Sequence, residues 1–304
     1  MGKILIYYRY ITIDNPPEVA EWQRTLCTSL NLLGRILVAP EGINGTVSGH
    51  PDTVQVYKTA MHQHPLFAGT AFKEEDGPQN CFPRLQVTVK PHIVNFGASA
   101  NIAATGTHLP PAQAHELMQN PPDDLIIFDA RNNYESRVGK FDGALTPDIE
   151  NFRDLPAYFD AHAHDFKDKR VLMYCTGGIR CEIASAYLQQ KGVAKEVMQL
   201  EGGIISYAQE FPDGFFRGKN YVFDGRVTVP ITNDILTQCD LCTTSCDEYT
   251  HCLNAPCNKQ IVACSGCIKQ LQNCCSTACL ELVTSGQTHK RPPFKKATSC
   301  TVTL

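Results

Sequence analysis

An apolar run that ends in a cysteine constrains this 304-residue chain more than any other feature of its sequence. The run is RVLMYC (170–175), and it is followed by the short loop TGGIR (176–180) and by the helix-like segment CEIASAYLQQKG (181–192). A continuous apolar run indicates a strand buried on both faces, as in a parallel sheet covered by helices. Two similar runs, LIIFDAR (125–131) and EVMQL (196–200), lie nearby. Residues 108–215 are therefore predicted to form an α/β domain around a parallel sheet.

The segments on either side predict two further units. Residues 1–95 follow the order strand, helix, strand, strand, helix, strand, which is that of a ferredoxin-like α+β domain. The closing strand is expected in QVTVKPHIVNF (86–96). Residues 216–285 are rich in cysteine and too small and polar to form a core without help, so they are predicted to be a separate module. Residues 286–304 are predicted to be a flexible tail.

The loop after the central strand has the composition of an anion site. Sites in parallel sheets form at the carboxyl ends of strands, where Cys175 lies. The glycines allow a tight turn, so that Thr176, Gly177, Gly178 and Ile179 can form an anion cradle with their backbone N–H groups. The start of the following helix and the charge of Arg180 both favour a thiolate. We therefore expect a reactive Cys175; the alternative is a small buried hydrophobic residue.

The length of this loop bears on its chemistry. Cysteine phosphatases place five residues between cysteine and arginine, whereas four separate Cys175 from Arg180 here. The smaller ring fits one extra sulfur better than a phosphate, which favours persulfide chemistry over phosphoryl transfer. Cys181 has two open interpretations. It resolves an oxidised or persulfidated Cys175 by forming a disulfide, or it packs beneath the loop as an apolar residue.

Cysteines are concentrated near the carboxyl end: ten of the fifteen lie between Cys239 and Cys279. Two C-x-x-C pairs, Cys239/Cys242 and Cys264/Cys267, have the spacing of a tetrahedral structural zinc site. Thiolate ligation would supply folding energy that so small a segment lacks. Disulfides, an iron–sulfur cluster and free thiols are the alternatives. The remaining six cysteines leave room for a second site, with His251 as a further candidate ligand: Cys246, Cys252, Cys257, Cys274, Cys275 and Cys279.

Composition and motifs narrow the class of protein. No stretch reaches the roughly 18 apolar residues of a membrane helix, and the first residues lack a signal-peptide cleavage site, so a cytoplasmic location is expected. The net charge of −4 does not indicate a nucleic-acid partner, although a local patch remains open. We find no G-x-G-x-x-G, no flavin motif and no two-histidine carboxylate iron site, so the sequence leaves any organic cofactor unknown.

Several motifs together resemble known families. The segments IIFDARNNYESRVGKFDGAL, RVLMYCTGGIRC and LEGGI resemble a rhodanese domain. With APEGINGTVS, NYVFDGR and the pattern CDLC…CDEYTHC…ACSGC…CCSTAC, nearly the whole chain resembles the rhodanese-containing tRNA uridine hydroxylase family. The resemblance implies that the persulfide-forming cysteine is Cys175. Asp129 and Arg131 are expected to form a buried charge pair. One departure is Gly139-Lys140, where rhodaneses usually carry Gly-His.

The resemblance implies an enzyme that converts the wobble uridine of tRNA, position 34, into 5-hydroxyuridine. Molecular oxygen would be the co-substrate, with an unidentified electron donor, and Cys175, Arg180 and Cys181 would be the catalytic residues. The partner would be the anticodon loop, which the two outer domains suit. Tyr7, Tyr8 and Tyr10 stack on bases or pack in the core. The alternatives are a sulfurtransferase that passes sulfur from Cys175 to a thiol, and a metal-dependent scaffold without activity, which the intact Cys175 and Arg180 disfavour.

Overall fold

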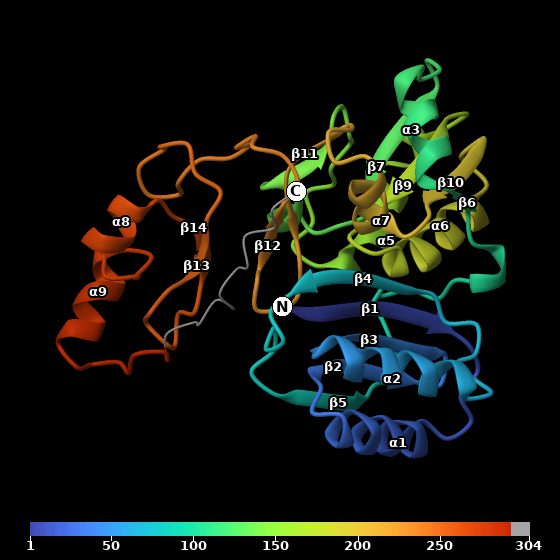
Figure 1. Cartoon of the computed structure of the whole chain (residues 1–304). Helices are drawn as coiled ribbons and strands as arrows, with labels where there is room; N and C mark the ends of the chain where they lie inside the picture. Colours follow the sequence, from blue (N-terminus) through green and yellow to red (C-terminus); the bar gives the residue numbers. More distant parts are fainter. Residues whose placement is uncertain (293–304) are drawn as a thin grey trace.

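The computed structural model describes residues 1–292 and contains the three units expected from the sequence (Figure 1). A five-stranded sheet occupies the first part of the chain, and a four-stranded parallel sheet occupies the middle. A small lobe with a two-stranded sheet and two short helices, coloured orange to red, extends to one side of both. The predicted fold class is therefore confirmed. Within residues 1–292, no helix is long and apolar enough to cross a membrane.

The first unit has the strand order β4-β1-β3-β2-β5. Its first four strands have the ferredoxin-like arrangement, and β5 adds a parallel strand beside β2. The elements are β1 (Gly2–Tyr10), α1 (Pro16–Ser29), β2 (Leu33–Ala39), β3 (Gly42–Gly49), α2 (Pro51–Gln63), β4 (Phe72–Gly77) and β5 (Leu85–Val89).

The closing strand of this unit differs from the prediction. The segment FKEEDG forms β4 beside β1, whereas QVTV lies in β5 at the opposite edge of the sheet. Charged side chains are common on an edge strand, because only one side of the strand pairs and its side chains remain near solvent. The apolar pattern therefore did not reveal β4.

The two faces of the first sheet have different partners. Leu5 and Tyr7 point to the face that α1 and α2 cover, and they form one core with those helices. Because strand side chains alternate, Ile6 and Tyr8 point to the other face. The strand register sets Tyr8 beside Asn44 and Ile6 beside Thr46, on the face that no helix of this unit covers.

The second unit is a parallel sheet of order β6-β10-β9-β7, with helices on both faces. One core lies between the strands and α5 and α6, and the other lies between the strands and α3 and α7. The elements are η1 (Ile102–Ala104), β6 (Thr107–Leu109), α3 (Pro111–Gln119), β7 (Leu125–Asp129), α4 (Asn133–Ser136), β8 (Gly139–Phe141), η2 (Phe152–Asp154), α5 (Leu155–Ala161), η3 (Ala163–Phe166), β9 (Arg170–Tyr174), α6 (Ile179–Lys191), β10 (Glu196–Leu200) and α7 (Gly203–Glu210).

The expected buried charge pair is confirmed at the end of β7. The guanidinium of Arg131 donates to both carboxylate oxygens of Asp129, at 2.8 and 2.7 Å, and both side chains are fully buried. Ser136 and Tyr174 donate further hydrogen bonds to the same carboxylate. These additional donors compensate for the loss of water around the buried charges. The pair therefore fixes the polar end of this strand.

The third unit is joined to the second by β11 (Phe216–Tyr221), which pairs with β8 and with β12 (Thr228–Pro230). The lobe itself contains β13 (Tyr249–His251), β14 (Gln260–Val262), α8 (Ser265–Gln270) and α9 (Thr277–Thr284). In the predicted tail, the backbone N–H of Arg291 donates to Leu253 and that of Ala255 donates to His289. This part of the tail is therefore held against the lobe. The rest of the predicted tail, residues 293–304, lies outside the described residues.

Candidate active site and thiol clusters

The Cys175 loop joins the end of β9 to the start of α6. The backbone N–H of Gly178 donates to Cys175 Sγ at 3.1 Å, with Gly178 in a conformation of φ +100° that favours glycine. Gly203 packs against the same loop. A Cβ on that residue would lie 2.4 Å from the Cys175 carbonyl oxygen and 2.9 Å from two loop nitrogens. The LEGGI segment therefore contributes the close approach that shapes the loop.

The surroundings of Cys175 favour its thiolate. Burial by itself raises the pKa of this cysteine. A hydrogen bond from the Cys181 thiol, the charge of Arg180 and the backbone N–H groups of Arg180 and Cys181 act in the opposite direction. Together they lower the pKa to about 5. Burial and the neighbouring Cys175 raise the pKa of Cys181, so Cys181 stays protonated and its S–H donates a hydrogen bond to the thiolate.

Arg180 has a partner that the sequence reading missed. Its guanidinium donates two hydrogen bonds to Glu135, at 2.6 and 2.7 Å, and a third to Thr176 Oγ1 at 3.2 Å. Glu135 is fully buried and belongs to the capping box that begins α4 at Asn132. The Asn-x-x-Glu spacing of a capping box was the one available signal in the sequence. Glu135 of α4 and Thr176 of the loop thus fix the position of the Arg180 guanidinium.

A second unexpected group links the first two units. Glu182, the residue after Cys181, accepts hydrogen bonds from Tyr8 Oη at 2.8 Å and from Gln199 at 3.1 Å, and it bonds His108 Nε2 at 2.9 Å. Lys73 of β4 places its ammonium 5.1 Å from the centre of the Tyr8 ring. Tyr8 therefore neither packs in its own core nor lies free to stack, because its hydroxyl is bound to the Cys175-bearing domain.

A cavity of about 490 Å³ lies between the two units, and Cys175 is among its lining residues. Its other wall is the helix-free face of the first sheet, represented by Tyr8, Asn44 and Thr46. The ring centres of Phe152 and Phe223 lie 5.9 and 5.7 Å from the guanidinium carbon of Arg180. The volume and the mixture of aromatic and polar walls are typical of a ligand site.

Two features of the cavity suit a nucleic acid. Phe223 lines the cavity and keeps 52% of its surface exposed. Arg35 and Arg153 also line the cavity, and both are exposed. An exposed aromatic ring offers a stacking surface for a base, and the two arginines offer charges for phosphates.

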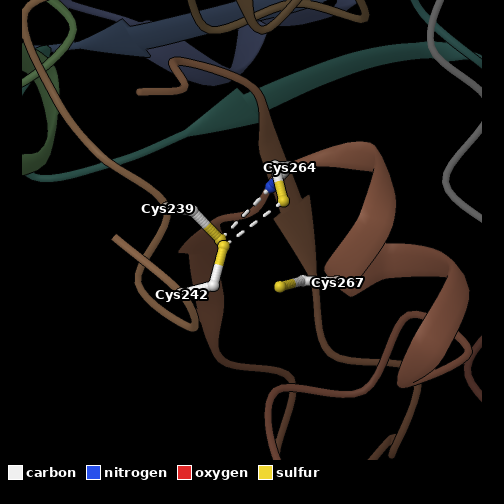
Figure 2. Close-up of side chains that lie close together, drawn as sticks. All are labelled: Cys239, Cys242, Cys264 and Cys267. Atoms are coloured by element: carbon white, nitrogen blue, oxygen red, sulfur yellow. Dashed lines mark hydrogen bonds between the residues drawn. The ribbon is translucent and has the colours of Figure 1, made fainter. Parts of the chain in front are cut away.

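The four cysteines predicted to bind zinc lie together in the third unit (Figure 2). The sulfur atoms of Cys239, Cys242, Cys264 and Cys267 all lie within 4.8 Å of one another. Cys242 Sγ and Cys264 Sγ are 3.6 Å apart, and the N–H of Cys264 donates to Cys239 Sγ at 3.3 Å. Every cysteine within residues 1–292 is a free thiol. The donor set and spacing therefore fit a tetrahedral metal ion with four sulfur ligands.

A second group of four thiols was not assigned from the sequence. Cys252, Cys257, Cys275 and Cys279 also have their sulfur atoms within 4.8 Å of one another. His251, considered as a ligand from the sequence, is not in this group. The spacings within this group are C-x₄-C and C-x₃-C, so no C-x-x-C motif marked them in the sequence.

Comparisons with known proteins agree with this division of the chain. Family models match residues 2–93 as a UPF0176 acylphosphatase like domain, residues 110–210 as a Rhodanese-like domain and residues 217–280 as a Rhodanase C-terminal region.

Similar curated proteins carry one name, tRNA uridine(34) hydroxylase. The protein of that name from Chlamydia felis is 37% identical over 308 residues, covering 98% of this chain and 94% of its own length. That from Chlamydia trachomatis serovar D is 39% identical, covering 90% of this chain and 85% of its own. That from Corynebacterium diphtheriae is 37% identical, covering 92% and 96%. The chain therefore belongs to the tRNA uridine(34) hydroxylase family.

Proposed function

We propose that this protein hydroxylates C5 of uridine 34 in tRNA to give 5-hydroxyuridine, with molecular oxygen as the oxidant and Cys175 as the reactive group. The observation that carries the proposal is the position of Cys175: its thiolate lies in the wall of a cavity shared by two domains. The similarity to tRNA uridine(34) hydroxylases over nearly the full chain supports the choice of substrate.

The cavity suits a single nucleotide turned out of the anticodon loop. Proteins that read single-stranded RNA stack bases on aromatic side chains, and Phe223 offers such a surface beside Arg180. Arg35 and Arg153 lie at the same cavity for the flanking phosphates. Asn44 and Asn132 bring amide groups that pair with the polar edge of a uracil. The partner that we propose is therefore the anticodon loop of a tRNA, and the location that we propose is the cytoplasm.

The chemistry begins with nucleophilic addition, which an activated thiolate can perform. The sulfur of Cys175 forms a bond to C6 of the uracil, and the C5–C6 electron pair moves to C5 and the C4 carbonyl as an enolate. The enolate gives two electrons to oxygen, so that a C5–O bond forms and protonation yields a hydroperoxide.

The second half of the reaction releases the product. A dithiol reductant supplies two electrons and two protons, which break the O–O bond, release water and leave a hydroxyl on C5. Loss of the C5 proton and cleavage of the C6–S bond then restore the ring double bond and the thiolate. In sum, uridine, oxygen, two electrons and two protons give 5-hydroxyuridine and water.

The neighbouring residues hold this thiolate ready. Cys181 donates a hydrogen bond to Cys175, and Arg180 supplies positive charge while Glu135 fixes its orientation. Of the four residues expected to form the anion cradle, Gly178 donates its backbone N–H to the Cys175 sulfur, and the backbone N–H groups of Arg180 and Cys181 act on it as well. Zinc held by Cys239, Cys242, Cys264 and Cys267 would have a structural role only, since it would stabilise the fold of the lobe.

One observation favours sulfur transfer as the second candidate function. Cys175 has no exposed surface, whereas the outer sulfur of a persulfide would stand about 2 Å beyond it. A persulfide would therefore reach an acceptor more easily than the thiol itself. In that case the product would be a sulfurated acceptor, and no oxygen would enter the uridine.

The test is genetic complementation in a host without any other route to 5-hydroxyuridine. The chromosomal gene is deleted, and the native protein, Cys175→Ala or Cys27→Ala is restored before the tRNA nucleosides are analysed by mass spectrometry. Cys27 is the matched control, because it is equally buried but lies in the core of the first unit. We expect the native protein and Cys27→Ala to restore 5-hydroxyuridine and Cys175→Ala to fail. Restoration by Cys175→Ala would reject the proposed role of the cysteine.

A further inference from the structure

The second thiol group in the lobe has the geometry of a metal site. Cys257 Sγ and Cys275 Sγ are 3.6 Å apart, and Cys275 Sγ and Cys279 Sγ are 3.7 Å apart. A disulfide would require about 2.05 Å. Four sulfur atoms bound tetrahedrally to zinc at roughly 2.3 Å lie about 3.8 Å from one another. The observed distances therefore match sulfurs around one ion and do not match a bonded pair.

The second group repeats the construction of the first. In each, the first cysteine is buried and accepts a backbone hydrogen bond from the third. Cys264 N–H donates to Cys239 Sγ at 3.3 Å, and Cys275 N–H donates to Cys252 Sγ at 3.4 Å. Backbone N–H groups directed at sulfur favour an anionic ligand over a thiol. The same backbone-to-sulfur hydrogen bond thus occurs in both thiol groups of the module.

The backbone repeats as well. The residue after the second cysteine has a positive φ in both groups, Thr243 at 61° and Asn258 at 46°. A left-handed residue is costly outside glycine and persists where the surroundings require it. In both groups the last cysteine lies in a short helix, Cys267 in α8 and Cys279 in α9. An amide N–H of Asn254 donates to Cys279 Sγ at 3.4 Å, one more donor directed at the second group.

The ligand pairs alternate along the chain. The first group consists of the pairs Cys239/Cys242 and Cys264/Cys267, and the second consists of the pairs Cys252/Cys257 and Cys275/Cys279. We propose that the module binds two zinc ions in this interleaved arrangement, the second ion being held by Cys252, Cys257, Cys275 and Cys279. Each ion would connect two segments that flank a ligand pair of the other ion in the sequence. Both ions would therefore stabilise the same fold. This inference is independent of the reaction at Cys175.

The two sites have different surroundings and therefore different effects. Cys239 shares a core with Tyr249, which hydrogen-bonds the backbone carbonyl of Tyr134, next to Glu135. The first site thus stabilises the segment that carries Glu135, the ion-pair partner of Arg180. Cys252 shares a smaller core with Val283 of α9, away from the cavity residues. Loss of the second ion should unfold the end of the lobe and leave the Cys175 loop in place.

Metal analysis of the full-length protein, purified without chelator, tests the proposal. Zinc per chain is measured by inductively coupled plasma mass spectrometry and by native mass spectrometry for the native protein, Cys252→Ala, Cys275→Ala and Cys274→Ala. Cys274 is the matched control, because it is adjacent to Cys275 and buried but belongs to neither group. Replacing zinc with cobalt adds an independent readout, since thiolate-to-cobalt absorption scales with the number of occupied four-sulfur sites.

We expect the native protein and Cys274→Ala to hold two zinc ions, and Cys252→Ala and Cys275→Ala to hold one and lose half of the cobalt absorption. Both one-ion variants should keep a Cys175 that reacts with iodoacetamide at the native rate. One zinc ion in the native protein, or two with Cys275→Ala, would overturn the proposal. A native mass that reveals disulfides among these four cysteines would overturn it as well, and this last result does not depend on any variant folding.

Discussion

Arg180 and Glu135 form a bidentate ion pair beside the Cys175 loop, with N–O distances of 2.6 and 2.7 Å. Glu135 is fully buried and Arg180 is 7% exposed, so each charge depends mainly on the other for compensation. Removing one partner of such a pair leaves the other charge buried and uncompensated. The pair therefore connects the stability of the domain to the placement of the arginine whose charge lowers the pKa of Cys175.

Replacement of the carboxylate tests this connection. We expect Glu135→Ala to lower the free energy of unfolding by about 3–5 kcal/mol, because it strands the Arg180 charge. Glu135→Gln should recover part of the loss, because an amide oxygen still accepts one hydrogen bond. Urea unfolding measures the change, with Asp160→Asn as the control, since Asp160 pairs with Lys191 at the exposed surface. Equal urea midpoints for Glu135→Ala and the native protein would contradict the account.

The reactivity of Cys175 should follow its lowered pKa. The pKa is about 5, well below that of an ordinary cysteine, so the thiolate exists above that pH and is lost as the pH falls through it. We expect the rate of alkylation of the Cys175 peptide by iodoacetamide to change little between pH 6 and 8 and to drop near pH 5.

The same titration tests whether Cys181 stabilises the Cys175 thiolate. Its thiol donates a hydrogen bond that lowers the pKa of Cys175, so Cys181→Ala should move the alkylation midpoint upward, toward the ordinary cysteine range. Cys27, whose pKa burial raises to about 12, should remain unreactive in all samples. An unchanged midpoint in Cys181→Ala would contradict a hydrogen bond from Cys181 to the thiolate.

Phe223 should contribute to tRNA binding and not to the thiolate. Stacking of one base on an aromatic side chain is worth about 1–3 kcal/mol, which corresponds to a roughly 5- to 150-fold weaker affinity for Phe223→Ala. Binding of an unmodified tRNA, measured by fluorescence anisotropy, checks this value. Ile235→Ala is the matched control, because Ile235 is also an exposed apolar residue but does not line the cavity. Equal losses in both variants would reject a specific stacking contact.

Covalent addition to C6 predicts a trapped complex with tRNA that contains 5-fluorouridine. Fluorine occupies the position from which a proton must leave, so the adduct cannot release its product in the usual way. We expect a protein–RNA species that resists denaturation and contains the Cys175 peptide. It should form with the native protein and with Cys27→Ala, and not with Cys175→Ala. Its complete absence under conditions where the native protein is active would exclude the sulfur adduct.

Local patterns in the sequence predicted much of this molecule. The strands of the parallel sheet appeared as continuous apolar runs because both faces are buried, and β7, β9 and β10 lie where those runs were found. The loop from Cys175 to Arg180 was recognisable because its glycines and its cysteine lie within one short segment. The cysteine pairs of the first thiol group were recognisable because of their C-x-x-C spacing.

Contacts between distant segments were not predictable in the same way. Tyr8 and Glu182 are separated by 174 positions, and nothing in either segment indicates the other. The Asn-x-x-Glu spacing could have marked Glu135 only as a helix-capping residue, whereas its pairing with Arg180 depends on how two strands are ordered in the sheet. The edge strand β4 was missed because its charged residues lack an apolar face. These features depend on how the domains pack against one another.

The most direct test of the central claim is oxygen-isotope labelling with purified components. The native protein is incubated with unmodified tRNA, a dithiol reductant and oxygen-18 gas, beside Cys175→Ala and Cys27→Ala, and nucleosides are analysed by mass spectrometry. The account predicts labelled 5-hydroxyuridine at position 34 with the native protein and Cys27→Ala, and none with Cys175→Ala. An oxygen atom derived from water, or equal labelling with Cys175→Ala, would contradict it.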